Sequence, residues 1–502
     1  MVTYKKARLT RLNEAPTNAA GRYVLYWCQM FRRLSRNHAL DYAVAVANEL
    51  KKPLVVYEGL RLDYPWASRR LHTFVLEGMR ENARRAKELG LTYWPFVETP
   101  SAPARGLVRL LARDAAVVVT DDFPCFVVPG QSAALAAKVE VPVFAVDGNC
   151  VVPLANLGPS VSAAAHLRPR IHKAFVEAWG HRAEVTPRLG RDARVRVDPP
   201  FAVWEPPADL PHFVASLPLD PLPAVQDTPG GESAARQRLS DFLARRLRGY
   251  AESRSQPASL EEGFASGLSP YLHFGHLSIE EVVERALDVP GPWTPAEIDV
   301  KQRGRREGFF CRDANVNAFL DEALTWRDVG FLWHSKRRED TGHLATALPF
   351  WALETLKKHA ADPRAYVYSR EEWEAGETHD ELWNAAQKEL VATGRLHNYL
   401  RMLWGKKVLE FSASPEEAYQ TLVHLNNKYA LDGRNPNSYT GILWTFGLFD
   451  RPWPPERNVL GSIRYMSSGN TAKKFRLGPY LDYVKRLPSI ASVRAGGAAS
   501  KE

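Results

Sequence analysis

The chain has 502 residues, 45% of them hydrophobic and 25% charged, with a formal net charge of +9. This length is more than one hydrophobic core usually serves, so at least two domains are expected. The four cysteines are far apart and form no CxxC pair, which fits neither a disulfide framework nor a cysteine-based metal site. No uninterrupted run of about 18 apolar residues occurs in the sequence. We therefore expect a cytoplasmic protein with no bound metal and no membrane partner.

Residues 20–148 alternate short apolar runs with amphipathic helical stretches. The apolar runs are RYVLYW, PLVVYEGL, LTYWPFV, AAVVVTDD and VPVFAVDG. Near-continuous β-branched runs between helices are typical of a parallel sheet that is covered on both faces. The pattern predicts a doubly wound, Rossmann-like α/β domain. No GxGxxG follows the first strand, so a standard dinucleotide site is not predicted there.

The rest of the chain divides into three parts by composition. Residues 149–231 are rich in Pro and weakly periodic, as expected of a long tether between domains. Residues 232–487 are helical in pattern and predict an all-α domain, with Ser at the expected N-caps of LSIEEVVERAL and SPEEAYQTLVHLNNKYAL. Residues 488–502 have the composition of a disordered tail. The fold class is therefore α/β plus all-α.

Polar and aromatic side chains recur together in the helical half. Glu322 and Trp326 lie four residues apart, on one helix face, although this spacing alone favours an amphipathic surface pair. For Arg401 and Trp404, with Trp383 one helical stretch earlier, a buried aromatic cluster with a structural Arg is the favoured interpretation. The run LNNKYALDGRNPNSYTGILWTFGLFDRPW fits either a helix connection or a site that stacks a flat heterocycle and hydrogen-bonds its edge.

The C-terminal end is strongly basic. Residues 451–502 contain ten Lys and Arg against three Asp and Glu, a net charge of +7. This charge is consistent with a nucleic-acid partner and, equally, with a solvated basic surface.

Several long motifs occur in the order found in one known family. They are RNHALDYAVAVANELKKPLVVYEGL, GLSPYLHFGHLS, YVYSREEWEAGETHDELWNAAQKELVATGRLHNYLRMLWGKKVLEF, the run LNNKYALDGRNPNSYTGILWTFGLFDRPW and GSIRYMSSGNTAKKF. With these motifs the chain resembles the class II branch of the photolyase/cryptochrome family over roughly residues 20–487. The resemblance implies an α/β domain, a long connector and a helical domain that binds FAD.

The resemblance also implies a set of cofactor contacts. Arg401 and Asp432 would form an ion pair beside the isoalloxazine, and Asn426 would face flavin N5, where an amide can adapt its hydrogen bonding to the redox state. The other residues implied to hold FAD are Tyr250, Ser266, Gly267, Leu268, Ser269, Arg327 and Gly433. Relatives also carry an antenna chromophore, either a deazaflavin or a folate, and no motif selects between its two types or establishes its presence.

The function that the resemblance implies is light-dependent splitting of cyclobutane pyrimidine dimers by a carbon–carbon lyase. Trp326 and Trp444 would stack on the extruded bases, while Glu322, in its protonated form, would hydrogen-bond a thymine edge. Trp383 and Trp404 would carry electrons from the surface to oxidised flavin. The residues implied to contact DNA phosphates are Lys406, Lys407, Arg451 and Arg464. The partner would be UV-damaged single- or double-stranded DNA, bound by a monomer that associates with the nucleoid.

Two features depart from the family pattern. Relatives usually end the LEF motif with Trp where this chain has Phe411, and often place Tyr where it has Leu403. Phe is hard to oxidise, so either the electron chain is interrupted or the change is a harmless packing substitution. The stretch 288–319 is longer and more basic than expected, and its KQRGRRE sequence fits either a DNA contact or a solvated loop.

Two other functions stay open. A cryptochrome-like photoreceptor would bind flavin and signal through partners, but the short C-terminal remainder and the presence of Glu322, Trp326 and Trp444 favour repair. A flavoprotein that binds DNA without catalysis is suggested only by Phe411 and Leu403.

Overall fold

A computed structural model describes residues 6–337 and 342–496 of the chain. Six strands form one sheet in its N-terminal part. The strands are β1 (Leu9–Arg11), β2 (Tyr23–Cys28), β3 (Leu54–Leu60), β4 (Thr92–Val97), β5 (Ala115–Asp121) and β6 (Val143–Val146). Their order is β1-β6-β5-β2-β3-β4, and every neighbouring pair is parallel except β1 with β6. The predicted parallel sheet is confirmed, with an antiparallel edge strand added.

Alternate residues of β2 face two different layers of helices. Val24 and Tyr26 belong to the same buried cluster as α1 (His38–Leu50) and α2 (Arg69–Leu89). Tyr23 and Leu25 pack instead with the apolar side chains of α3 (Leu107–Arg113) and α4 (Val128–Ala136). A strand buried on both faces needs apolar side chains at every position, which explains the continuous run in the sequence.

The segment 149–231 is more regular than the tether that its Pro content predicts. It contains α5 (Ala164–Trp179) and α6 (Leu210–Ser216), with short 3₁₀ turns η2 (Leu154–Leu157) and η3 (Asp192–Arg194). Pro169 lies inside α5 and obscured the helix in the sequence. The buried residues Leu167, Ile171 and Phe175, at intervals of four, are the signal that reveals it.

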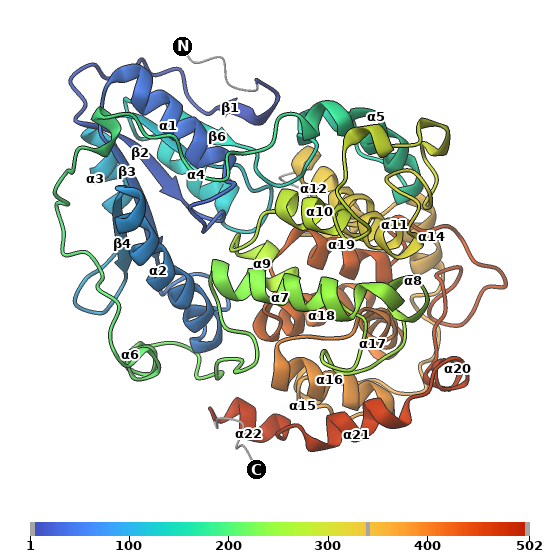
Figure 1. Cartoon of the computed structure of the whole chain (residues 1–502). Helices are drawn as coiled ribbons and strands as arrows, with labels where there is room; N and C mark the ends of the chain where they lie inside the picture. The colour runs from blue at the N-terminus through green and yellow to red at the C-terminus, as the bar shows by residue number, and fades with distance from the viewer. Residues whose placement is uncertain (1–5, 338–341, 497–502) are drawn as a thin grey trace.

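Helices make up the rest of the chain, as predicted (Figure 1). They are α7 (Glu232–Arg245), α8 (Tyr250–Ser253), α9 (Ser269–His273), α10 (Ile279–Leu287), α11 (Ala314–Leu320), α12 (Arg327–Lys336), α13 (Leu344–Ala347), α14 (Phe350–Lys358), α15 (Arg370–Ala375), α16 (Glu381–Thr393), α17 (Asn398–Phe411), α18 (Pro415–Tyr429), α19 (Pro436–Thr445), α20 (Ser468–Lys474), α21 (Gly478–Arg486) and α22 (Ile490–Arg494). Shorter turns are η1 (Lys6–Arg8), η4 (Leu247–Gly249), η5 (Pro295–Glu297) and η6 (Val300–Gln302), and η7 (Asp321–Trp326) is a π-helical turn.

The C-terminal end corrects one prediction. Residues 488–502 were expected to be disordered, but α22 forms within them and buries Val493. A single apolar residue in a short polar stretch gives too little sequence signal for such a helix. Residues 497–502 lie outside the described residues.

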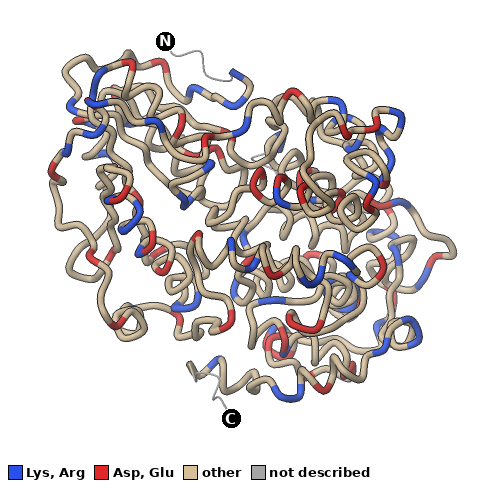
Figure 2. The backbone as a smooth tube through the Cα atoms, viewed as in Figure 1, with Lys and Arg blue, Asp and Glu red and all other residues tan. Residues whose placement is uncertain are grey.

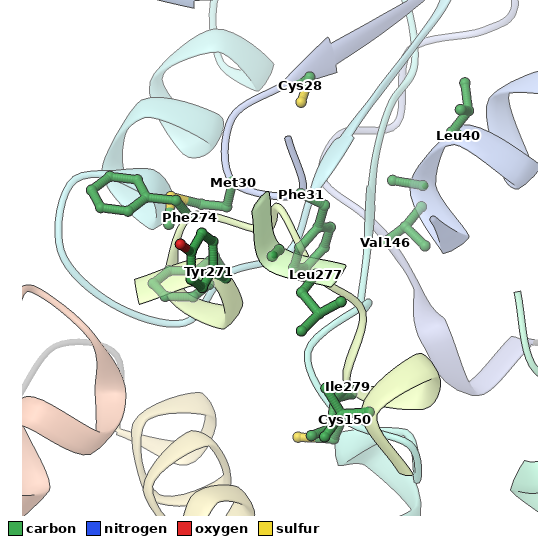
Figure 3. Close-up of a cluster of buried hydrophobic side chains, with 14 of the residues drawn as sticks. Cys28, Met30, Phe31, Leu40, Val146, Cys150, Tyr271, Phe274, Leu277 and Ile279 are labelled. Carbon is green, nitrogen blue, oxygen red and sulfur yellow. The ribbon is translucent and has the colours of Figure 1, made fainter. Parts of the chain in front are cut away.

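One hydrophobic core joins one face of the sheet to the first helices of the C-terminal part, and a separate core lies among the later helices. Figure 3 shows Met30 and Phe31, which follow β2, packed near Tyr271, Phe274 and Leu277 from α9 and the turn after it. Within the described residues, no helix has both the length and the apolar character needed to cross a membrane.

Candidate functional site

Glu322 lies in η7, the π-helical turn between α11 and α12. The sequence predicts one continuous α-helix here, whereas the wider π turn resets the direction of the side chains, a feature frequent at functional sites. The Glu322 carboxylate accepts a hydrogen bond of 3.0 Å from Arg254, which also lies over the Tyr250 ring. Burial raises the pKa of Glu322, and Arg254 opposes this rise. The carboxyl is therefore held closer to its neutral form than an exposed glutamate.

The tryptophans expected to stack on a substrate are both accessible. Trp326 is 37% exposed, and Trp444, on α19, is half-buried. Trp444 lines a cavity of about 420 Å³ together with Tyr399, Trp453, Arg464 and Lys474. Large aromatic faces beside cations suit planar bases attached to phosphates.

Arg464 is the best-anchored cation of this cavity. Its guanidinium forms two hydrogen bonds with Asp450, of 2.9 and 3.1 Å, and lies 4.0 Å from the Trp453 ring centroid and 5.6 Å from that of Trp444. Burial alone would raise the pKa of Asp450, but the hydrogen bonds from Arg464 and Trp453 lower it. Arg451 is exposed and covers the other part of the Trp453 ring at 4.6 Å. Both arginines remain candidates for DNA contacts.

Lys406 and Lys407 require a correction. Both are buried: the Lys406 ammonium group donates to the Thr445 carbonyl at 2.6 Å and lies 4.6 Å from the Trp444 ring centroid. Lys407 pairs with Glu410 at 2.9 Å. Burial lowers the pKa of Lys406 to about 7. Because these amines use internal partners, they are not placed to contact phosphates directly, and Lys406 instead supports Trp444 from below.

The residues expected around a flavin ring are brought together. Arg401 of α17 and Asp432 form an ion pair of 3.2 Å that is partly exposed, and Asn426 of α18 is buried. A Cβ added at Gly433 would lie 2.8 Å from the Asn426 carbonyl oxygen, so glycine is needed for this close approach. An accessible charge pair beside a buried amide, inside a helical domain, is a suitable donor set for a redox-active ring.

The expected phosphate and ribitol contacts fall into two groups. The segment Ser266–Ser269 turns at Gly267, with φ +68°, and leaves Ser269 exposed. Arg238 lies 3.5 Å from where a Cβ of Gly267 would be. Leu268, by contrast, is buried and contributes to the core. Arg327 directs its guanidinium to Asp328, at 3.1 Å, because this buried carboxyl needs a counter-charge.

Trp383 and Trp404 stack with nearly parallel rings, whose centroids are 6.2 Å apart, and their role in electron transfer stays a prediction. Both are buried and hydrogen-bonded: Trp383 donates to the Trp404 carbonyl and Trp404 to Gln387, each at 3.0 Å. Phe411, at the end of α17, contacts His379 edge-on at 5.0 Å. The two indoles therefore form one buried, hydrogen-bonded pair at the contact between α16 and α17.

A second cavity, of about 480 Å³, opens at the carboxyl ends of β2 and β3. Ligands of open α/β sheets bind at this edge, where the strand order reverses. Among the residues that line it, Arg32, Arg61, Arg105, Arg109, Lys138 and Arg434 are cationic and none is acidic. The cavity therefore suits an anionic molecule, and Trp27 and Tyr64 add aromatic surface to it.

Some residues of the site were not found from the sequence. Arg254 bonds to Glu322, Trp453 packs on Arg464 and Tyr399 lines the same cavity as Trp444, yet each lies in a segment whose helical or turn pattern explains it fully. Arg254 follows Tyr250 at an interval of four, which is the one spacing signal available. In the part of the chain that the structure describes, no cluster of three or more His, Cys, Asp or Glu could hold a metal ion.

The structure has an α/β part with one cavity large enough for a ligand and a helical part with a second cavity lined by aromatic and cationic side chains. It is therefore a protein of the α/β plus all-α class with a candidate site in each part. No family model matches the chain. It is 33% identical to the deoxyribodipyrimidine photo-lyase of Methanothermobacter thermautotrophicus, over 96% of this chain and 98% of that protein. It is 34% identical to the deoxyribodipyrimidine photo-lyase of Oryza sativa subsp. japonica, over 94% and 89%. The chain therefore belongs to the photolyase/cryptochrome family.

Two further comparisons are consistent with this assignment. The archaeal photolyase of Sulfolobus tokodaii, whose crystal structure has two FAD molecules, shares the fold with a TM-score of 0.59 at 14% identity, over 94% of this chain and 92% of that one. Similarity to cryptochrome-2 of Arabidopsis thaliana is confined to 37% of this chain and 26% of that protein, at 26% identity. Similarity to photolyases is thus more extensive than similarity to this cryptochrome.

Proposed function

We propose that the protein is a light-dependent DNA-repair lyase that splits cyclobutane pyrimidine dimers. One observation supports it most: two accessible tryptophans and a cation-lined aromatic cavity occur in the same helical unit as a carboxyl with a raised pKa. Its near full-length similarity to two deoxyribodipyrimidine photo-lyases supports the same conclusion. The much shorter similarity to a cryptochrome makes signalling the weaker alternative.

The helical unit has side chains that suit FAD. Arg401 and Asp432 would flank its ring, the Asn426 amide would adapt to the protonation state of a ring nitrogen, and the Ser266 and Ser269 hydroxyls would meet its polar chain, with Tyr250 nearby. When bound and reduced, FAD supplies the single electron that opens the dimer after absorbing blue light.

The remaining steps belong to the protein and the DNA. Enzymes of this kind extrude the target base, which costs least for a damaged base that is already poorly stacked. Trp326 and Trp444 would stack on the extruded bases, and Lys406 beneath Trp444 fixes the orientation of that indole. Glu322 in its neutral form would donate a hydrogen bond to a thymine carbonyl and so stabilise the negative charge that develops on the dimer.

The cavity at the edge of the sheet would hold a second chromophore. Its aromatic and cationic lining suits a conjugated molecule with an anionic tail, and both a deazaflavin and a folate satisfy this description. The absorption spectrum of the purified protein, recorded before and after denaturation, distinguishes these two molecules from an empty cavity.

A repair assay tests the proposed function. The reduced protein, under blue light, should remove cyclobutane dimers from an irradiated oligonucleotide and should not do so in the dark. We expect Glu322→Ala to slow repair about 100-fold, since removing one optimally placed donor has effects of this order or larger. Trp326→Ala should instead weaken binding of the lesion, with a loss of about 1–3 kcal/mol of stacking.

The alternatives predict different results. No light-dependent loss of dimers in the wild type, with FAD bound, would reject the repair function and leave the photoreceptor or a non-catalytic DNA-binding flavoprotein. A colourless protein that cannot take up FAD would reject all three. Arg84→Ala, at an exposed position of α2, is the control and should repair at the wild-type rate.

A further inference from the structure

A group of cations outside the proposed repair site lies in the loop 299–308. Its stretch KQRGRR, residues 301–306, has four cations and no acid, and all four of these side chains are exposed. None of the four forms an ion pair with another residue of the described chain. Acids occur only at the ends of the loop, at Asp299 and Glu307. Four unpaired cations within six residues form a surface typical of polyanion binding.

The backbone of this loop is fixed, unlike that of an ordinary solvated loop. The Gly304 N–H donates to Nδ1 of His172 at 3.1 Å, and Phe309 stacks on the same imidazole with centroids 3.7 Å apart and an interplanar angle of 9°. Gly304 has φ +83°, and a Cβ there would lie 3.3 Å from the ring of Pro169. Because the backbone of the loop is already ordered before a partner binds, less conformational entropy is lost on binding.

The helix that holds the loop also holds the repair site. His172 and Pro169 belong to α5, and so does Arg168, which forms hydrogen bonds of 2.6 and 3.1 Å with Asp321. Asp321 directly precedes Glu322. Arg306 acts on the same site through its charge, because it opposes the rise in the pKa of Glu322. The position of the loop relative to Glu322 is therefore set by one rigid element.

The loop continues a basic edge of the molecule. Glu322 is hydrogen-bonded to Arg254. Gln256, two residues after Arg254, donates to the Arg476 carbonyl at 2.9 Å. Arg476 lies just after the cations of α20. Figure 1 shows the loop beside α5 and α11 at the upper right and α20 at the lower right. Figure 2 shows Lys and Arg at both places along this side. Cations thus lie on both flanks of the site.

We propose that the loop 299–308 binds the phosphate backbone of duplex DNA on one flank of the lesion, through Arg303, Arg305 and Arg306. This inference rests on the proposed repair function. The loop would hold the duplex while the damaged bases enter the site, and its contacts would be independent of the base sequence, since arginines on a phosphate backbone position without reading bases.

Affinity measured at several salt concentrations tests the loop. The probe is a fluorescent duplex that contains one thymine dimer, titrated with wild type and with a triple variant, Arg303→Ala, Arg305→Ala and Arg306→Ala. Each lost phosphate contact should reduce the slope of log Kd against log salt by about 0.9, so the expected reduction is about 2 to 3. At physiological salt the affinity should fall roughly tenfold to a hundredfold.

A control variant separates position from net charge. Arg84→Ala, Lys87→Ala and Arg188→Ala remove the same charge from exposed positions far along the chain, on α2 and after α5. It should keep the wild-type affinity and slope. If the loop variant matches this control, the loop proposal is overturned. If the wild type itself neither binds nor repairs the duplex, the repair function fails instead.

A third variant keeps every charge. Gly304→Ala would force the loop away from Pro169 and should weaken binding in the same direction as the triple variant, with unchanged FAD content. Repair at saturating DNA should stay at the wild-type rate in Gly304→Ala, because this change leaves every charge near Glu322 in place. Unchanged affinity in Gly304→Ala would contradict the role assigned to the fixed loop position.

Discussion

At the scale of single residues, the environment of Glu322 shifts its pKa, so the proposed reaction would depend on its protonation state. Burial raises the pKa of its carboxyl, and Arg254 counteracts part of this effect. A neutral carboxyl can donate a hydrogen bond to a thymine carbonyl, whereas a carboxylate would repel the negative charge that develops there. In the proposed repair reaction, the balance between burial and Arg254 would tune the step in which charge reaches the dimer.

We expect repair to slow as the pH rises through the raised pKa of Glu322, because the donor form is then lost. Glu322→Gln keeps a neutral donor that does not titrate, so its repair rate should be independent of pH between about 6 and 9. The measurement is the rate of dimer loss at saturating DNA. Glu252→Gln, an exposed carboxyl on α8, should keep the wild-type pH profile. Equal pH profiles in wild type and Glu322→Gln would remove this role.

The sequence predicted many individual side chains of the candidate site but few of their partners. The ion pair of Arg401 and Asp432 forms as the resemblance implies, with Asp432 in the turn between α18 and α19. The stacking of Trp383 on Trp404 was not predicted. The environment of Lys406 was not predictable, because a Lys in a helix next to Trp gives no sign of whether its amine faces water or a carbonyl oxygen. Such information arises only when α17 packs against α19.

At the scale of elements, α16 and α17 hold an aromatic path whose usual end is altered. Phe411 is poorly suited to give up an electron, but other aromatics continue from Trp383. Trp373 lies 4.5 Å from the Trp383 ring centroid, and Tyr368 5.0 Å from that of Trp373. The backbone N–H of His379 donates to the Tyr368 oxygen at 3.0 Å, and the Tyr368 oxygen lies 2.7 Å from Nδ1 of His379, which accepts the phenol proton when the imidazole carries its own proton on Nε2. A tyrosine with a bonded proton acceptor can release an electron and its proton together.

We expect light-driven reduction of bound flavin to be slow in the wild type and about tenfold faster in Phe411→Trp. Tyr368→Phe should slow the wild type further, because it removes the phenol next to Trp373 that has a bonded proton acceptor. The measurement is the decay of flavin absorbance under blue light, with transient absorption to detect tryptophan and tyrosine radicals. Rapid reduction in the wild type would show that Phe411 does not interrupt the path. Tyr366→Phe tests whether the exposed tyrosine that stacks on Tyr368 and His379 is the outermost donor instead.

Elements with long patterns were predictable, and those shaped by one local event were not. The strands β2 to β6 and helices such as α18 follow from apolar periodicity, while α5 was hidden by Pro169 and η7 by an ordinary helical pattern. A single π turn leaves no periodic pattern in the sequence. Only the packed structure therefore reveals that Glu322 and Trp326 lie in one.

At the scale of the whole molecule, one buried arginine joins the sheet-side helices to the helical unit. Arg70 of α2 donates to the carbonyl oxygens of Pro223 at 3.0 Å, Tyr429 at 2.9 Å and Val391 at 2.7 Å. Burial lowers its pKa to about 10, so it remains charged at neutral pH. The class of each half was predictable, but this junction was not, because its partners lie more than 150 residues away in sequence.

We expect Arg70→Met to lower the free energy of unfolding by about 3 kcal/mol, because three buried carbonyl groups would lose their donors. Arg84→Met, at an exposed position of the same helix, should change it by less than about 0.5 kcal/mol. Thermal unfolding followed by circular dichroism gives both values. If the junction couples the two halves, the Arg70 variant should also unfold in two steps, with the sheet and the helical unit separating. A single transition at the temperature of the control would show that the shared hydrophobic core, rather than Arg70, holds them together.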